Sequence, residues 1–208
     1  VIEYMLTILN SNFEDWRRAN PDAPIGDFKF SVKKMNAAGS LFDIAKLCDV
    51  SKNVIAKFDA EKVYSYVLEW AKDYDPDFAK ELEAEKEASI AVLSIGRGGK
   101  KPRKDIAVWT DVKDNMGFIF DGYYNAEGEY PENFDKKLIT DVLKAYIEVY
   151  SENDEQTEWF DKIKDVSEKF GFARETKEYK ASPESYKGHV GDISAFIRVA
   201  VTGKQNAP

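Results

Sequence analysis

Hydrophobic residues recur along most of this 208-residue chain at intervals of three and four, which is the period of an amphipathic helix. The period is clearest over residues 59–73, where Asp59 is a suitable N-cap. The apolar positions behind this cap are Val63, Tyr66, Val67 and Trp70. Residues 75–88, in which Glu and Lys alternate, predict a second helix with a solvated face.

The second half of the chain shows the same period. Three more helices are predicted there: residues 134–149, 151–170 and 190–202. Pro131 lies near the start of the first of them, and Ser151 with Asp154 resembles a capping pair that opens the next. Gly171 and Gly203 are natural C-terminal stops.

Strand signals are confined to one place. Phe28, Phe30 and Val32 alternate with polar residues, which allows at most one short strand pair near residues 28–32. Turn-rich or polar stretches interrupt the helices in three places: residues 20–26, 97–104 and 122–131. The expected fold class is mainly α, a helical bundle or cage of two small helical subdomains that meet near residues 125–130.

Composition and charge exclude several classes of function. The chain has 13 Phe, 11 Tyr and 4 Trp, enough to fill a core, and a formal net charge of −8, which argues against wholesale coating of nucleic acid. Its single cysteine, Cys48, excludes an internal disulfide and a multi-cysteine zinc site, and its single histidine, His189, excludes a histidine-rich metal centre. No metal site is expected.

The chain shows no membrane or secretion signal. No run approaches the roughly 18 consecutive apolar residues of a transmembrane span, and the first residues do not resemble a signal peptide. We therefore expect a cytoplasmic protein, monomeric and without a membrane partner.

Residues 97–104 are the clearest departure from the acidic composition. Five of these eight residues are cations, and none is an acid: Arg97, Lys100, Lys101, Arg103 and Lys104. Glycines in this stretch let backbone approach a ligand closely, and clustered cations suit a polyanion whose phosphates supply affinity. A flexible, solvated basic loop is an equally good interpretation. The stretch is not a Walker A loop, because Gly99-Lys100 is followed by Lys101 instead of Ser or Thr.

The other candidates favour structural interpretations. His189 has no Cys or His partner nearby in sequence, and Cys48 lies in an apolar helical patch. Glu83 and Glu87 lie on a charged helix face, which is more typical of a solvated surface than of acid–base catalysis. The four tryptophans lie in helical patterns and are expected to pack in the core instead of stacking on bases: Trp16, Trp70, Trp109 and Trp159. From its residues alone the chain is a helical module with one basic loop and no visible catalytic site.

Four segments in order resemble the C-terminal half of bacterial class I glutamyl-tRNA synthetases, and the resemblance covers essentially the whole chain. Residues 6–18 look like the helix that follows the catalytic region, and residues 36–47 are similar to the family's Ser-Gly-Ala-x-Phe-Asp-x-x-Lys-Leu signature. Residues 101–103 fall where the family has a basic Pro-Arg turn. Residues 188–203 look like its terminal Leu-Arg-x-Ala-Leu-Thr-Gly helix.

The resemblance implies a fragment that performs no chemistry alone. Its expected parts are a stem-contact region with linker helices (1–58) and two anticodon-binding helical subdomains (59–124 and 125–208), the second truncated at its C-terminal end. The ATP-site signatures His-Ile-Gly-His and Lys-Met-Ser-Lys-Ser are absent from this sequence. By the resemblance, ATP and Mg²⁺ bind in a separate N-terminal catalytic domain, which is an expected partner, while the fragment itself holds no cofactor.

The family's functional residues carry over to two arginines. Arg103 occupies the position of the arginine that reads the third anticodon base, and Arg198 matches one that approaches the first. The chain departs from the family at Ala207-Pro208, where a Thr-Pro pair is frequent, which weakens the first-base assignment. The remaining cations are candidate contacts to the RNA backbone: Arg97, Lys100, Lys101, Lys104 and Lys204.

Each arginine also has a simpler interpretation. Arg103 could pair with nearby Asp105, and Arg198 could form a helix-face ion pair with Asp192. By the resemblance, exposed aromatic residues should assist base recognition, and Tyr123, Tyr124 and Tyr130 are candidates.

The predicted function is therefore tRNA anticodon recognition within an enzyme that attaches glutamate to tRNA-Glu. One alternative is a non-discriminating synthetase that also charges tRNA-Gln. An alternative of another class is a helical protein-interaction module whose basic loop meets an acidic protein.

Overall fold

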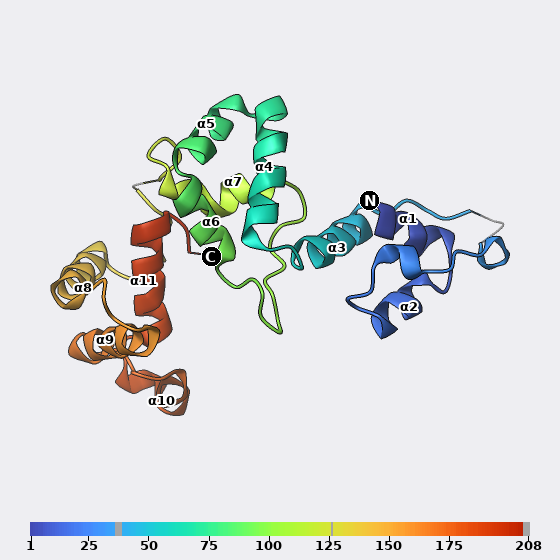
Figure 1. Cartoon of the computed structure of the whole chain (residues 1–208). Helices are drawn as coiled ribbons and strands as arrows, with labels where there is room; N and C mark the ends of the chain where they lie inside the picture. Colours follow the sequence, from blue (N-terminus) through green and yellow to red (C-terminus); the bar gives the residue numbers. More distant parts are fainter. Residues whose placement is uncertain (36–38, 126, 206–208) are drawn as a thin grey trace. The chain divides into compact units, whose positions relative to one another are not determined.

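The computed structural model describes residues 1–35, 39–125 and 127–205, which form two compact units, Val1–Met116 and Gly117–Pro208 (Figure 1). The α-helices of unit 1 are α1 Ile2–Leu9, α2 Phe13–Ala19, α3 Ile44–Ile55, α4 Ala60–Tyr74, α5 Pro76–Ala84, α6 Lys86–Ser94 and α7 Thr110–Met116. Those of unit 2 are α8 Lys136–Val149, α9 Gln156–Lys169, α10 Thr176–Ala181 and α11 Val190–Thr202. Short 3₁₀ turns lie at Ile25–Asp27, Val32–Lys34, Gly117–Ile119 and Pro183–Ser185. The mainly α fold class is confirmed.

Unit 1 is built around α4. The Asp59 side chain accepts a hydrogen bond from the Lys62 amide, so the predicted N-cap is confirmed. Val63, Val67 and Ala71 form the fully buried stripe of α4, and Phe78 and Leu82 of α5 are buried beside it. Both α5 and α6 pack against α4.

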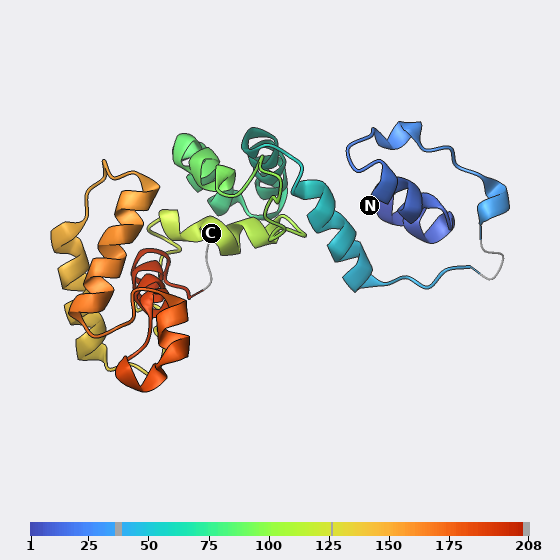
Figure 2. The ribbon, with the colours of Figure 1, turned by 90° about the horizontal axis from the view of Figure 1, so that it is seen from below.

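Unit 2 has a core of three helices that lie side by side in Figures 1 and 2: α8, α9 and α11. Its fully buried side chains include Val142, Ile163, Ile193 and Phe196. Gly203 ends α11 in the left-handed region, at φ 74°, as its sequence position predicts. His189 has the structural role expected of it, because its Nδ1 accepts a hydrogen bond from the Gly191 amide at the start of α11.

Two local predictions are wrong. Residues 75–88 are not one helix: the chain turns at Glu85 between α5 and α6, which lets both helices bury apolar residues against α4. Ser151 and Asp154 do not open α9, which begins at Gln156 behind Glu155. The Asp154 carboxylate instead pairs with Lys162 at 2.7 Å, an ion pair that takes it away from the helix amides.

Residues 28–32 are extended in part but form no strand, and the described residues contain no sheet. Phe28 is buried against Phe13, while Phe30 and Val32 are exposed. The side-chain amide of Asn10 donates to the Ser31 carbonyl at 2.7 Å, which attaches this segment to the end of α1.

The sequence-based division of unit 1 near residue 58 and the boundary at 125 stay predictions. Of the residues singled out from sequence, 36–38 and Ala207-Pro208 lie outside the part of the chain that the structure describes. No helix among the described residues is long and apolar enough to cross a membrane.

Candidate RNA-binding site

The basic stretch lies between α6 and α7 in unit 1, where the chain leaves α6, passes the junction of α3 and α4, and returns to α7 (Figure 1). Two contacts fix this path to α3. The Arg97 guanidinium donates from Nη1 to the Ile55 carbonyl at 3.0 Å, and the Ser51 hydroxyl donates to the Ala107 carbonyl at 2.6 Å. The path is therefore attached to α3 at Arg97 and again at Ala107, just beyond the stretch, while residues 98–101 between them are exposed.

Arg103 rests on Gly96. The Arg103 amide donates to the Gly96 carbonyl at 2.9 Å, which closes residues 96–103 into a loop. Gly96 has φ +71°, and a Cβ there would lie 2.5 Å from Cδ and 2.6 Å from Cγ of Arg103. Only glycine leaves room for the arginine stem and adopts this backbone conformation without strain.

The guanidinium of Arg103 forms one ion pair through one of its nitrogens. Its Nη2 pairs with a carboxylate oxygen of Asp105 at 2.8 Å, as one of the two sequence interpretations expected. The Arg103 side chain is still 32% exposed, and Asp105 is its one polar side-chain partner among the residues described. An arginine has five N–H donors in a planar fork, so several donors of Arg103 remain available at the surface.

Arg97, Asp105 and Arg103 form a small charge cluster. Burial lowers the pKa of the Arg97 guanidinium, the negative charge of Asp105 opposes this shift, and the positive charge of Arg103 adds to it. Asp105 therefore offsets the repulsion between two arginines. Arg97 is partly buried and bonded to α3, so the structure gives it an anchoring role, and its contact with RNA phosphate stays a prediction.

The lysines of the loop differ from the two arginines. Lys100, Lys101 and Lys104 are exposed, and no ion pair or hydrogen bond engages their ammonium groups within the described part of the chain. They flank Arg103 in the sequence and add three positive charges near its seat, the place where its side chain packs on Gly96. The arrangement can attract a polyanion and present one oriented guanidinium to it.

Arg198 and Lys204 lie in unit 2, at the end of α11. Arg198 does not pair with Asp192, because Nη1 of Arg198 donates to the Gln205 carbonyl at 3.0 Å and Asp192 accepts from the His189 amide. Lys204 is exposed just beyond the helix. The three tyrosines expected to assist recognition also belong to unit 2, where the Tyr124 hydroxyl donates to the Ala200 carbonyl at 2.5 Å.

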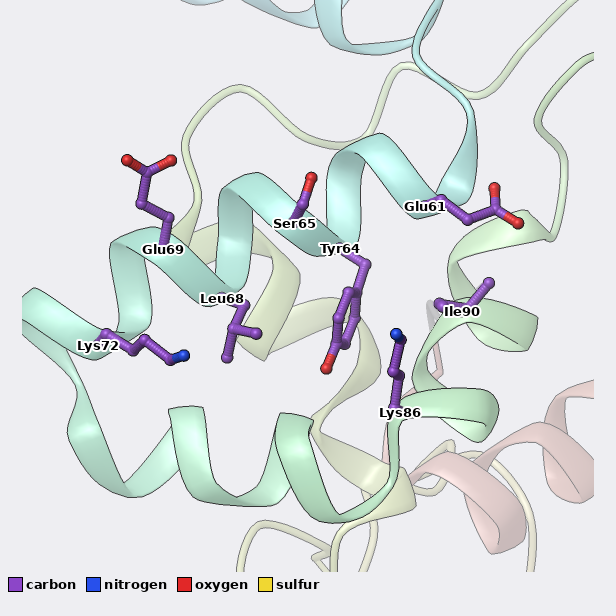
Figure 3. Close-up of a pocket in the computed structure, with 8 residues that line it drawn as sticks. All are labelled: Glu61, Tyr64, Ser65, Leu68, Glu69, Lys72, Lys86 and Ile90. Carbon is purple, nitrogen blue, oxygen red and sulfur yellow. The ribbon is translucent and has the colours of Figure 1, made fainter.

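A cavity of about 490 Å³ lies in unit 1 between α4 and α6 (Figure 3). Its lining contains two lysines and two glutamates, and Lys72 is already paired with Glu83 at 2.7 Å. The Tyr64 hydroxyl at its floor already donates to the Leu82 carbonyl at 2.9 Å. The cavity therefore offers no preference for an anion, and no cluster of metal-binding side chains occurs among the described residues.

Sequence reasoning located the cations but missed two features of their setting. The seat provided by Gly96 depends on a left-handed backbone angle, for which the only sequence signal was a glycine just before the basic stretch. The tryptophans were expected in the core, yet all four are only partly buried. Trp109 stacks on Tyr66, a surface residue of α4 that is 41% exposed.

Comparison with known proteins gives one consistent result. The chain is 48% identical over 208 residues to a glutamate–tRNA ligase of Acetivibrio thermocellus, 41% identical over 209 residues to that of Sorangium cellulosum, and 40% identical over 213 residues to that of Clostridium perfringens. No family model and no solved structure matches the chain. All of this chain is aligned in each case, but only 37–39% of the relative. The chain is therefore similar along its whole length to glutamate–tRNA ligases and spans little more than a third of their length.

Proposed function

We propose that this chain is the C-terminal, anticodon-binding part of a glutamate–tRNA ligase that acts on tRNA-Glu. The similarity to such ligases along the entire chain supports the parent activity. The observation that carries the anticodon role is the seat of Arg103, a partly exposed guanidinium oriented by Asp105 among exposed lysines. In this proposal the missing catalytic domain binds ATP and Mg²⁺ and joins glutamate to the tRNA, while the present chain holds the anticodon.

The chemistry of Arg103 suits an unpaired cytosine. Cytosine presents two adjacent acceptors, O2 and N3, which a guanidinium fork can satisfy together. Guanine presents N1–H and N2–H₂ donors at the same edge, so donors would face donors and their hydrogen bonds would be lost. Since tRNA-Glu and tRNA-Gln differ at the third anticodon base, C against G, Arg103 favours a ligase restricted to tRNA-Glu. Equal charging of both tRNAs by the full enzyme would instead show the relaxed activity.

Binding of an anticodon stem-loop tests the proposal. The 208-residue chain should bind the tRNA-Glu stem-loop more tightly than one with a scrambled loop, as measured by fluorescence anisotropy. The logarithm of the binding constant should fall with the logarithm of salt concentration by about 0.7 per single-stranded phosphate neutralised. Equal binding of both RNAs, or none, would contradict the proposal, and capture of an acidic protein by the loop would favour a protein-interaction module.

Gly96→Ala tests the seat of Arg103. The new Cβ would overlap the arginine stem, and the φ of +71° would be strained, so the guanidinium should move from its place beside Asp105. We expect a loss of stability of about 1 kcal/mol, with a loss of preference for the tRNA-Glu stem-loop. Gly98→Ala is the matched control, because Gly98 has φ +73° with open space around it. If both variants bind alike, the seat is not needed for recognition.

A further inference from the structure

Two aromatic stacks include residues of α4. In the first, the Phe58 and Tyr66 ring centroids are 5.7 Å apart, and Tyr66 and Trp109 are also 5.7 Å apart, nearly parallel at 18°. In the second, Trp70 and Tyr74 are 6.3 Å apart, also at 18°. Both stacks reach the surface, since Tyr66 is 41% and Tyr74 is 75% exposed.

The first stack lies next to the basic loop. The Ile55 carbonyl accepts two hydrogen bonds, one from the Phe58 amide at 3.0 Å and one from the Arg97 guanidinium at 3.0 Å. At the other end, Ala107 is held on α3 by Ser51, two residues before Trp109. Arg97, the first cation of the loop, and the three stacked rings therefore lie near the C-terminal end of α3.

The charged groups beside the two stacks differ. The Lys62 ammonium lies 4.3 Å from the centroid of the Phe58 ring, and it adds a cation to the first stack. Tyr74 of the second stack is flanked in sequence by Asp73 and Asp75, with Asp77 close behind. Asp75 is paired with Lys113 at 2.5 Å and Asp77 with Lys80 at 2.8 Å, so the nearby cations of the second stack are already engaged by carboxylates. A polyanion is therefore attracted more strongly to the first stack than to the second.

We infer that the stack of Phe58, Tyr66 and Trp109 is a stacking surface for unpaired bases of the RNA loop whose phosphates contact the neighbouring cations. This inference rests on the proposed anticodon function, and it adds base stacking to the hydrogen bonds and phosphate contacts already proposed. Aromatic rings beside a positively charged groove bind single-stranded nucleic acid, because every base has a π-face. Phe58 is only partly buried, and the Lys62 ammonium can leave its ring to contact a phosphate, which makes the ring accessible to a base.

The test uses the 208-residue chain and a tRNA-Glu anticodon stem-loop with 2-aminopurine at successive loop positions. Tyr66→Leu removes the exposed ring and keeps a good helix former, and Tyr74→Leu is the matched control on the same helix. We expect Tyr66→Leu to weaken binding roughly tenfold and to abolish quenching of 2-aminopurine at one or more positions. Tyr74→Leu should leave both readouts as in the unaltered chain, and circular dichroism should show that both variants fold.

The outcomes separate this inference from the proposed function. If the unaltered chain binds the stem-loop and Tyr66→Leu binds and quenches equally well, the stack is a packing feature and the inference is overturned. Equal losses in Tyr66→Leu and Tyr74→Leu would also overturn it, because the loss of binding would then not be specific to the first stack. If the unaltered chain does not bind the stem-loop, the proposed function fails first and the inference fails with it.

Discussion

Replacing Arg103 with glutamine should remove most of the preference for cytosine over guanine at the third anticodon base. Facing guanine, the arginine loses its hydrogen bonds to the base, which corresponds to a penalty of about 1–3 kcal/mol, or roughly 5- to 150-fold in binding. A glutamine amide carries both a donor and an acceptor, so it can satisfy either base in part. Overall affinity should fall less than the preference does, because the exposed lysines still contact phosphates.

The measurement compares binding of two anticodon stem-loops that differ only at the third base. Arg18→Gln is the matched control, since Arg18 is an exposed arginine of α2 whose Nη1 pairs with Asp15 at 3.2 Å. Arg18→Gln should keep the cytosine preference unchanged. An unchanged preference for cytosine in Arg103→Gln would contradict the role assigned to Arg103. Loss of this preference in both variants would mean that the overall positive charge of the chain, and not Arg103 in particular, sets it.

The second large effect is structural. Phe196→Ala should destabilise unit 2 by about 3–5 kcal/mol, because the Phe196 ring is fully buried and its removal leaves a cavity. The ring contacts Phe134 and Phe172 edge-to-face, at 5.1 and 6.3 Å between centroids, so two aromatic contacts are lost as well. Unit 2 has no disulfide to compensate, since the only cysteine lies in unit 1.

Chemical denaturation followed by circular dichroism measures this loss. Val201→Ala on the same helix is the control, because Val201 is 58% exposed and its truncation should change stability by less than about 0.5 kcal/mol. A similar small change in Phe196→Ala would mean that α11 does not contribute to the core as described.

The fold could be predicted where a single residue decides the local backbone. Asp59 and Gly203 mark helix ends by their own chemistry, one as an acceptor for free amides and one by its left-handed conformation. The turn at Glu85 was not predictable, because both flanking segments are good helix formers and the turn arises from packing on α4. The sequence around Asp154 is also typical of a helix cap, but in the structure its carboxylate pairs with Lys162, eight residues away.

The candidate site could be predicted in composition but not in geometry. A cluster of cations in an acidic chain is visible in the sequence, and so is the Pro-Arg turn that singles out Arg103. The stack of Phe58, Tyr66 and Trp109 was not visible, because Trp109 is far from the other two in sequence and its neighbours indicate a buried helix. Contacts between distant segments depend on tertiary packing, which local periodicity does not report.

The most direct test of the central claim is a crystal structure of this chain bound to the tRNA-Glu anticodon stem-loop. It should place guanidinium nitrogens of Arg103 about 3 Å from O2 and N3 of the third anticodon base, with Asp105 still paired to the same side chain. A third base held elsewhere, with Arg103 contacting only Asp105, would contradict the account.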